Sequence, residues 1–246
     1  MSPPRLLVTR PAARQQPFAS RARELGVEPV AFPCVEIRPE PALALPSPEA
    51  LAAFDAVLFT SRHAVEAVAR LRPFPWPGVA AWAIGVATGA ALARAGQPLA
   101  RMPEDAATSE ALVRALAREA PLGSLLVVKG RGGRELIASR QRERGTRVET
   151  LDGYRRARPV ADERTRRRAL VERVPDIVSV TSDEILDNFV ELAGDALPAL
   201  LPRPLILNSE RGAARARAHG FTGPAIVASP PGDEGQLAAL AAWLVA

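Results

Sequence analysis

Short apolar runs alternate with Ala-, Arg- and Leu-rich stretches along most of this 246-residue chain. Turn-forming residues bound each run, and several of the following stretches, which have helical character, end at a glycine. This alternation predicts βαβ units and a parallel sheet with helices on both faces. The predicted strands are Leu6–Thr9, Ala56–Thr60, Leu125–Val128, Ile177–Thr181 and Leu205–Asn208, and the helix-ending glycines are Gly26, Gly96, Gly145 and Gly220.

These elements form an internal repeat. Leu6–Val30 aligns without a gap with Leu125–Glu149, and nine of the 25 positions are identical. Two further pairs follow in the same order, Phe54–Val68 with Pro175–Phe189 and Ala81–Gly96 with Leu205–Gly220. About five βα units per copy predict two flavodoxin-like, doubly wound α/β domains, with the working site between them.

Polar residues follow the matched strands. Ligands of such sheets bind at the carboxyl ends of the strands, and helix N-termini there favour anions. The matched strand ends therefore predict anion-binding residues on each domain, although helix capping and surface ion pairing explain the same residue types. They are Arg10 and Lys129 after the first strands, Thr60-Ser61 and Thr181-Ser182 after the second, and Gly85 and Asn208-Ser209 after the third.

The basic charge is concentrated in one part of the chain. The net charge is +5, but Pro121–Arg173 holds 15 basic and 7 acidic residues, a local +8. This excess indicates an anionic partner, whereas the run Arg164–Arg173 is more typical of a solvated helix face. The loop Lys129–Arg134, which includes Gly130, has the spacing of neither a P-loop nor a dinucleotide-binding loop, and we interpret it as a basic loop that binds carboxylates.

Other features limit the class of protein. The N-terminus lacks a signal-peptide pattern, and the longest apolar stretch, Leu237–Ala246, is too short to cross a bilayer. Cys34 is the single cysteine, so we expect a reducing, cytoplasmic location and no disulfide. His63 and His219 are distant and lack carboxylates at ligand spacing, so no metal site is predicted. A monomer is expected because no apolar stripe is left over.

An ordered set of motifs covers nearly the whole chain and resembles uroporphyrinogen-III synthase. The motifs are VTRP at Val8–Pro11, FPCVEIRP at Phe32–Pro39, FTSRHAVEAV at Phe59–Val68, AIGVATGAAL at Ala83–Leu92, VVKGRGGRELI at Val127–Ile137, YRRARP at Tyr154–Pro159, VTSDEILDNF at Val180–Phe189 and NSERGAARARAHGF at Asn208–Phe221. The resemblance implies a cofactor-free lyase of haem, sirohaem and cobalamin synthesis. It closes hydroxymethylbilane, a linear tetrapyrrole with eight carboxylates, to uroporphyrinogen III with inversion of ring D and loss of water.

The resemblance also implies an interleaved domain arrangement. One domain would combine residues 1–35 with 160–246, and the other would span about 38–153, joined by linkers at about 32–39 and 151–159. Tyr154, the only tyrosine, matches the family's proposed acid, although simple packing at the hinge is the alternative. Ser209 and Arg211 match the distal substrate-binding site, where Glu210 departs from the family pattern and either points away or is neutralised by Arg211. A transient contact with the preceding enzyme of the pathway is a further expectation.

Three alternatives remain open from the sequence. A non-catalytic two-lobed homologue that binds tetrapyrroles or other anions has the same fold, but the presence of Tyr154 and both Thr-Ser pairs argues against it. A nucleic-acid-binding protein fits the basic charge, but aromatic residues make up only 4% and no binding motif is recognisable. A glycosyltransferase with two facing domains is disfavoured by the small size of each domain. We therefore expect neither nucleic-acid nor membrane binding.

Overall fold

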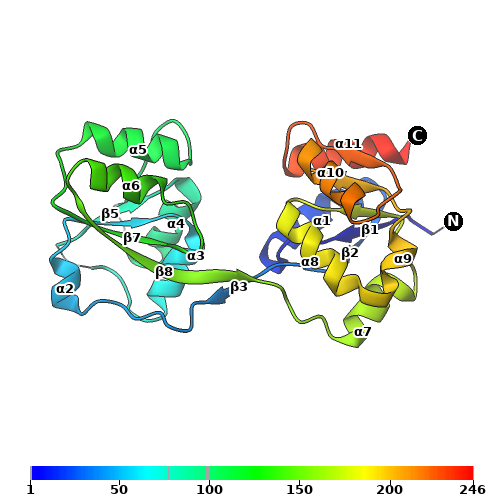
Figure 1. The fold of residues 1–246 in the computed structure, drawn as a ribbon, viewed down its shortest axis with the longest axis horizontal. Helices are drawn as coiled ribbons and strands as arrows, with labels where there is room; N and C mark the ends of the chain where they lie inside the picture. Colours follow the sequence, from blue (N-terminus) through cyan, green and yellow to red (C-terminus); the bar gives the residue numbers. More distant parts are fainter. Residues whose placement is uncertain (1, 77, 98–99, 246) are drawn as a thin grey trace. The chain divides into compact units, whose positions relative to one another are not determined.

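A computed structural model describes residues 2–76, 78–97 and 100–245, and the chain divides into two compact units. Unit 1 consists of the residues up to Glu36 together with those from Ala157 onward, and unit 2 consists of Ile37–Arg156. Each unit contains a sheet with helices packed against it (Figure 1). The chain therefore enters unit 2 once and returns once to unit 1.

The sheet of unit 1 has the strand order β11-β10-β9-β1-β2, and its neighbouring strands pair in parallel. This is the 2-1-3-4-5 order of flavodoxin-like sheets. The strands are β1 (Arg5–Val8), β2 (Glu28–Ala31), β9 (Ile177–Ser179), β10 (Leu205–Leu207) and β11 (Ala225–Val227). The helices are η1 (Ala12–Arg14), α1 (Gln15–Glu24), α7 (Glu163–Arg166), the π-helical turn η2 (Arg167–Val171), α8 (Asp183–Ala193), η3 (Gly194–Ala196), α9 (Leu197–Leu200), α10 (Glu210–Ala218) and α11 (Asp233–Leu244).

The sheet of unit 2 has the order β3-β8-β7-β4-β5-β6, and the pairs from β8 to β6 are parallel. Its strands are β3 (Glu36–Pro39), β4 (Ala56–Phe59), β5 (Ala80–Ala83), β6 (Ala100–Arg101), β7 (Ser124–Gly130) and β8 (Arg147–Ala157). Its helices are α2 (Pro48–Ala52), α3 (Arg62–Ala69), α4 (Val86–Arg94), α5 (Ser109–Arg118) and α6 (Leu136–Glu143). The segment 151–157, part of a predicted linker, is thus a paired strand.

The two sheets place the repeated segments in the same spatial order. In unit 1 the order is β2-β1-β9-β10. Strands β1 and β2 come from the first copy of the repeat, and β9 and β10 come from the second. In unit 2 the order is β8-β7-β4-β5, where β7 and β8 come from the second copy and β4 and β5 come from the first. Each unit is therefore built from parts of both copies, and the strand-end residues of matched segments occupy matching places in the two sheets.

Alternation along the strands directs apolar side chains to both faces of each sheet. In unit 1, Leu7 packs with α8 and α10, whereas Leu6 and Val8 pack with α1 and α11. In unit 2, Leu126 packs with α3 and α4, whereas Leu125 packs with α5 and α6. The matched helices end as predicted, because Gly26, Gly96, Gly145 and Gly220 all have positive φ, between 86° and 98°.

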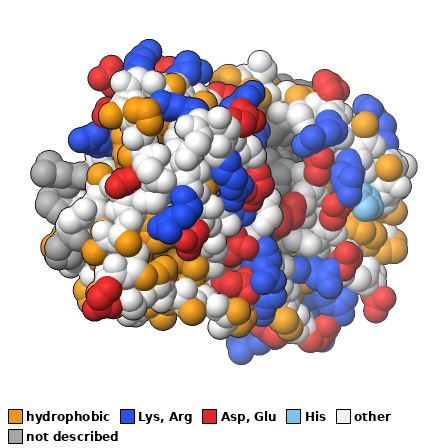
Figure 2. All heavy atoms as spheres, turned by 60° about the vertical axis from the view of Figure 1, so that its left-hand side comes forward, with side chains coloured by type: hydrophobic (Ala, Val, Ile, Leu, Met, Phe, Trp, Pro, Cys, Tyr) orange, Lys and Arg blue, Asp and Glu red, His pale blue; other side chains and the backbone are white. Residues whose placement is uncertain are grey.

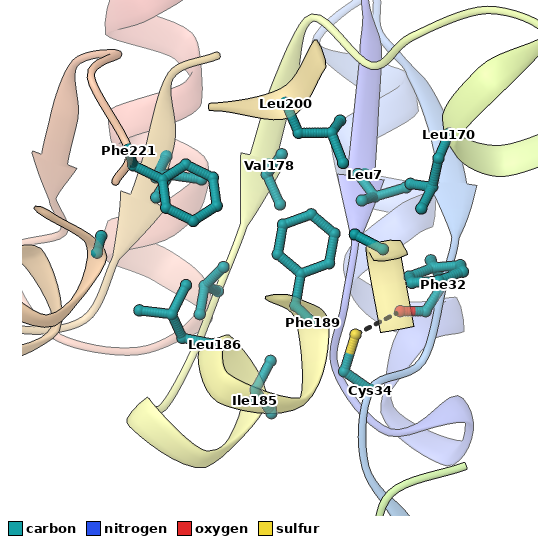
Figure 3. Packing of buried hydrophobic residues seen from close by; sticks show 14 of the residues in the cluster. Leu7, Phe32, Cys34, Leu170, Val178, Ile185, Leu186, Phe189, Leu200 and Phe221 are labelled. Carbon is teal, nitrogen blue, oxygen red and sulfur yellow. Dashed lines mark hydrogen bonds between the residues drawn. The ribbon is translucent and has the colours of Figure 1, made fainter. Parts of the chain in front are cut away.

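Phe189 occupies the centre of the core on one face of unit 1 (Figure 3). Its ring lies near Leu7, Val178 and Leu200 and contacts Phe32 edge-on at a centroid distance of 6.3 Å. Cys34 lies at the margin of this cluster, where its thiol donates to the Phe32 carbonyl at 3.3 Å. Burial raises the pKa of the Cys34 thiol, so this cysteine is a core residue rather than a nucleophile.

Candidate functional site

The carboxyl ends of β4 and β7 lie side by side in unit 2 and carry the predicted residues. Thr60 follows β4, and its N–H donates to the Val128 carbonyl of β7 at 3.1 Å. Ser61 is the N-cap of α3, because its hydroxyl accepts from the Ala64 N–H at 3.2 Å. The structure therefore brings the Thr-Ser pair next to the Lys129-Gly130 pair at one sheet edge.

Tyr154 reaches this edge from the neighbouring strand β8. It pairs with Gly130 at a bulge in the β7–β8 ladder, and its carbonyl accepts from the Arg131 N–H at 2.8 Å. A Cβ atom on Gly130 would lie 2.7 Å from Tyr154 Cζ, which is too close for any side chain. Glycine at position 130 is thus required for the phenol ring to lie across β7.

The phenol is connected to the N-terminus of α3. Ser61 Oγ donates to Tyr154 Oη at 3.1 Å while it accepts from the Ala64 N–H. These two bonds leave the phenol hydrogen available to donate outward. The resulting chain of donors runs from a backbone amide through a serine to a tyrosine, and it stabilises negative charge on the phenol oxygen.

His63 is a second aromatic neighbour of Tyr154, in the first turn of α3. The two rings meet edge-on at a centroid distance of 5.6 Å and an interplanar angle of 64°. His63 Nδ1 lies 3.2 Å from Glu66 Oε2, one turn along the helix. The imidazole therefore packs against the phenol ring and helps to fix its orientation.

Lys129 is buried and already paired. Its Nζ lies 2.9 Å from Glu135 Oε1 and 3.3 Å from Asp152 Oδ1, and its side chain is 9% exposed. Burial alone would lower the pKa of Lys129, but hydrogen bonds with Glu135 and Asp152 outweigh burial and raise it. Lys129 thus joins β7, β8 and the start of α6, and its charge is balanced within the unit.

Two helix N-termini of unit 2 carry predicted site residues, Ser61 at α3 and Gly85 at α4. The first turn of α3 holds no acidic residue, and neither does the first turn of α4, whose N-cap is Gly85. A Cβ atom on Gly85 would lie 2.3 Å from Ala107 Cβ, so this position excludes any side chain. Both helix ends therefore present backbone N–H groups without a competing carboxylate.

Unit 1 has matching caps but a different charge. Ser182 caps α8 through the Ile185 N–H at 3.3 Å, and Ser209 caps α10 through the Gly212 N–H at 3.1 Å. The Thr181 carbonyl accepts from Asn208 Nδ2 at 3.2 Å, which ties the two strand ends together. The first turns of α8 and α10 contain acidic residues, Asp183, Glu184 and Glu210.

Arg211 and Arg10 both have partners within unit 1. Arg211 Nε lies 2.8 Å from Asp183 Oδ2, so it neutralises this carboxylate, whereas no contact joins it to Glu210 among the described residues. Arg10 is 3% exposed, pairs with Asp233 at 2.5 Å and lies over the Phe18 ring. Burial lowers the pKa of Arg10, and the ion pair opposes that effect.

Comparison with known proteins identifies the family. The model of the family described as Uroporphyrinogen-III synthase HemD matches residues 16–237. A uroporphyrinogen-III synthase from Escherichia coli K12 is 30% identical over 225 residues, covering 88% of this chain and 92% of the relative. One from Synechococcus elongatus is also 30% identical, covering 78% of this chain and 75% of the relative. The chain belongs to the uroporphyrinogen-III synthase family.

Solved structures agree on the fold. A uroporphyrinogen-III synthetase from Helicobacter pylori superposes with a TM-score of 0.63 at 17% identity, covering 98% of this chain and 99% of that one. A mutant uroporphyrinogen III synthase from Thermus thermophilus gives 0.52 at 21%, with 98% and 97% coverage. As a member of the uroporphyrinogen-III synthase family, this chain is a cyclising lyase of tetrapyrrole synthesis.

Two contacts near the candidate site were not predicted from the sequence. The edge contact between His63 and Tyr154 is one, because only the β7–β8 register brings these residues together. The pair of Arg131 Nη2 with Glu40 Oε1 at 2.9 Å is another. The only available signal was that His63 lies two residues after Ser61, in the first turn of the predicted helix.

Several arginines of the basic region form local ion pairs. Arg140 pairs with Glu143 at 2.8 Å, and Arg166 pairs with Glu163 at 2.6 Å. Basic and acidic side chains are interspersed on the face shown in Figure 2. Within the run Arg164–Arg173, the ion pair of Arg166 with Glu163 favours the solvated-helix interpretation over the nucleic-acid alternative. Among the described residues, no His, Cys, Asp and Glu cluster could hold a metal ion, and no helix could cross a membrane.

Proposed function

We propose that this chain closes hydroxymethylbilane to uroporphyrinogen III, with Tyr154 as the proton donor. The observation that carries the proposal is the donor chain from the Ala64 N–H through Ser61 Oγ to Tyr154 Oη. A general acid must present its hydrogen outward and must tolerate the charge that it acquires. The chain of donors behind the phenol oxygen meets both requirements.

The reaction requires departure of a hydroxyl group and then formation of a carbon–carbon bond. Tyr154 Oη would give its proton to the departing hydroxyl, which leaves as water, and the phenolate would be stabilised by Ser61 and the N-terminus of α3. The proton lost when the pyrrole closes restores the phenol. Ring inversion depends on how the substrate is held, so positioning contributes much of the rate. Proton transfer and positioning need no cofactor, and we propose a cofactor-independent reaction.

The substrate carboxylates would be bound mainly by backbone groups. The N-termini of α3 and α4, capped by Ser61 and Gly85, offer N–H groups without acidic neighbours in their first turns. We propose that Thr60, Ser61, Gly85 and Gly130 bind carboxylates in unit 2, and that Thr181, Ser182 and Ser209 do so in unit 1. Arg10, Lys129 and Arg211 are paired with acidic residues, so we propose that they shape these edges and add positive potential.

Genetic complementation tests this function against the non-catalytic alternative. We expect the chain to restore tetrapyrrole synthesis and growth in bacteria that lack their own uroporphyrinogen-III synthase. A double variant, Ser61→Ala with Tyr154→Phe, should restore growth poorly at equal protein level, because it removes both side-chain donors. Failure of the folded, well-expressed wild-type chain would instead support a binding or regulatory homologue.

A further inference from the structure

Unit 1 contains a cavity beside its sheet. The cavity lies between the edge strand β2 and the α7–η2 segment and has a volume of about 330 Å³. Its lining includes Arg5, the first residue of β1, whereas Thr181, Ser182 and Ser209 follow the carboxyl ends of β9 and β10. The cavity is therefore separate from the proposed substrate-binding edge. Its size is in the range of small-ligand sites.

Arg5 is a buried arginine in the wall of this cavity. The residue is 5% exposed, and its Nη2 donates to the Arg168 carbonyl at 3.3 Å. Its Nε and Nη1 have no hydrogen-bond partner among the described residues, although Glu28 Oε1 lies 3.8 Å from Nε. Unpaired N–H groups on a buried cation are costly, so this site is suited to an acceptor with negative charge.

The surrounding charges leave an excess of cations. Arg168 also lines the cavity and is exposed. Glu28 is shared with Arg173, whose Nη1 lies 2.9 Å from Glu28 Oε2, and Asp176 accepts from the backbone N–H of Arg5 at 2.7 Å. Two guanidinium groups, of Arg5 and Arg168, and one carboxylate, of Glu28, therefore belong to residues that line the cavity. An added anion would balance the remaining charge and accept from Arg5.

The backbone at the cavity wall is unusual. Residues Arg167–Val171 form a π-helical turn, which is rare and is frequently found at functional sites. This turn carries Arg168 and Ala169, which line the cavity, and the carbonyl that Arg5 binds. One residue of the arginine-rich run Arg164–Arg173, Arg168, therefore lines the cavity.

We propose that this cavity binds a small oxyanion, a carboxylate or a phosphate, through Arg5 and Arg168. Guanidinium groups match the geometry of both anions and are weakly hydrated, which suits a partly buried site. The ligand would bridge β1, β2 and the π-helical turn and so stabilise unit 1. The inference does not depend on the proposed catalytic function, because no residue of the cavity belongs to the substrate-binding edge.

Calorimetric titration of the whole chain tests this site with two probes, inorganic phosphate and succinate, against potassium chloride at matched ionic strength. We expect saturable binding of one oxyanion per chain and a rise of the thermal unfolding midpoint, because the ligand binds the folded state. Arg168→Ala should weaken binding about tenfold, the loss of one charge-assisted contact. Arg164→Ala is the matched control, since Arg164 is exposed on α7 and does not line the cavity, and it should leave Kd within about twofold.

Arg5→Lys separates specific recognition from net charge. We expect it to weaken binding as much as Arg168→Ala does, because lysine lacks the planar donor set. Preference for phosphate or for succinate identifies which oxyanion the site takes, and either one supports the proposal. The proposal is overturned if neither probe saturates, if Arg164→Ala and Arg168→Ala behave alike, or if binding is lost in Ser182→Ala and Ser209→Ala instead.

Discussion

The phenol of Tyr154 owes its environment to residues that are distant in the sequence. Ser61 caps α3 and His63 lies in its first turn, Gly130 ends β7, and Tyr154 belongs to β8. The Thr-Ser motif predicts a helix cap at Ser61, and the family resemblance indicates Tyr154. Their hydrogen bond was not predictable, because it depends on the bulge that sets Gly130 opposite Tyr154.

Tyr154→Phe should lower kcat about 100-fold, near the lower end of the range for a general acid, and should leave KM within about threefold. The ring still packs against Gly130, so the fold is retained and only the donor is lost. Steady-state kinetics with hydroxymethylbilane measure the effect. An unchanged kcat would remove Tyr154 from the acid role.

His63→Ala should lower kcat by roughly 2- to 12-fold, because an edge contact between aromatic rings contributes about 0.5–1.5 kcal/mol. His63→Phe preserves a ring at this position and should recover most of the rate. Glu66→Gln keeps the imidazole in place and serves as the control. Equal rates for the Ala and Phe variants would show that ring packing does not position Tyr154.

The C-terminal helix α11 is attached to β1 by a buried polar network. Arg10 bonds to Asp233 at the start of α11 and donates to Gln236 Oε1 at 3.3 Å. Ser179 and Asn208 also bond to Gln236, which is itself fully buried. The sequence predicted a ligand-binding cation at Arg10. Its partner Asp233 was not foreseeable, because 223 residues separate the two.

Arg10→Met should therefore lower the free energy of unfolding by about 1.5–3 kcal/mol, the contribution of a charge-assisted hydrogen bond in a buried setting. Urea denaturation measures the loss. Arg21→Ala is the matched control, because Arg21 pairs with Glu234 on the same helix but on an exposed surface, where the denaturation midpoint should hardly change. A similar shift of the denaturation midpoint in both variants would contradict the claim that burial makes the Arg10 ion pair more stabilising than the exposed Arg21 pair.

Lys129 gives strand β7 a pH-dependent link to β8 and α6. Its pKa is raised in the folded state, because hydrogen bonds with Glu135 and Asp152 outweigh burial. The stabilisation is thus fully present below the ordinary lysine pKa of about 10.4 and is lost as pH rises through the higher folded-state value. The difference in unfolding free energy between wild type and Lys129→Met should shrink only in this alkaline range. A difference that instead falls between pH 5 and 8 would contradict the assignment.

Element positions followed closely from local pattern. The predicted strand Ala56–Thr60 is β4 at Ala56–Phe59, and Ile177–Thr181 is β9 at Ile177–Ser179. The extra predicted residues, Thr60 and the pair Val180-Thr181, lie in the loops before α3 and α8. The apolar runs that form strands and the glycines that end helices are local signals, so they can be recognised in a single sequence. The π-helical turn at Arg167–Val171 left no such signal, and one of its carbonyls, that of Arg168, accepts from Arg5, which is 163 residues away in the sequence.

At the level of the whole chain, duplication and domain organisation do not coincide. The repeat alone suggests a boundary between the copies, yet each sheet takes its first two matched strands from one copy and the next two from the other. Exchange of equivalent segments preserves every strand neighbour, so both arrangements satisfy the same hydrophobic pattern. Sequence periodicity therefore predicts the sheet, whereas the family resemblance was needed to propose the exchange.

The isomer composition of the product tests the central claim most directly. Purified protein would be incubated with freshly prepared hydroxymethylbilane, and uroporphyrinogens I and III would be separated after oxidation. Closure without ring inversion gives isomer I, so we predict that isomer III dominates with the wild-type chain and that Tyr154→Phe returns the mixture toward isomer I. Isomer I as the main product at saturating wild-type protein would contradict the account.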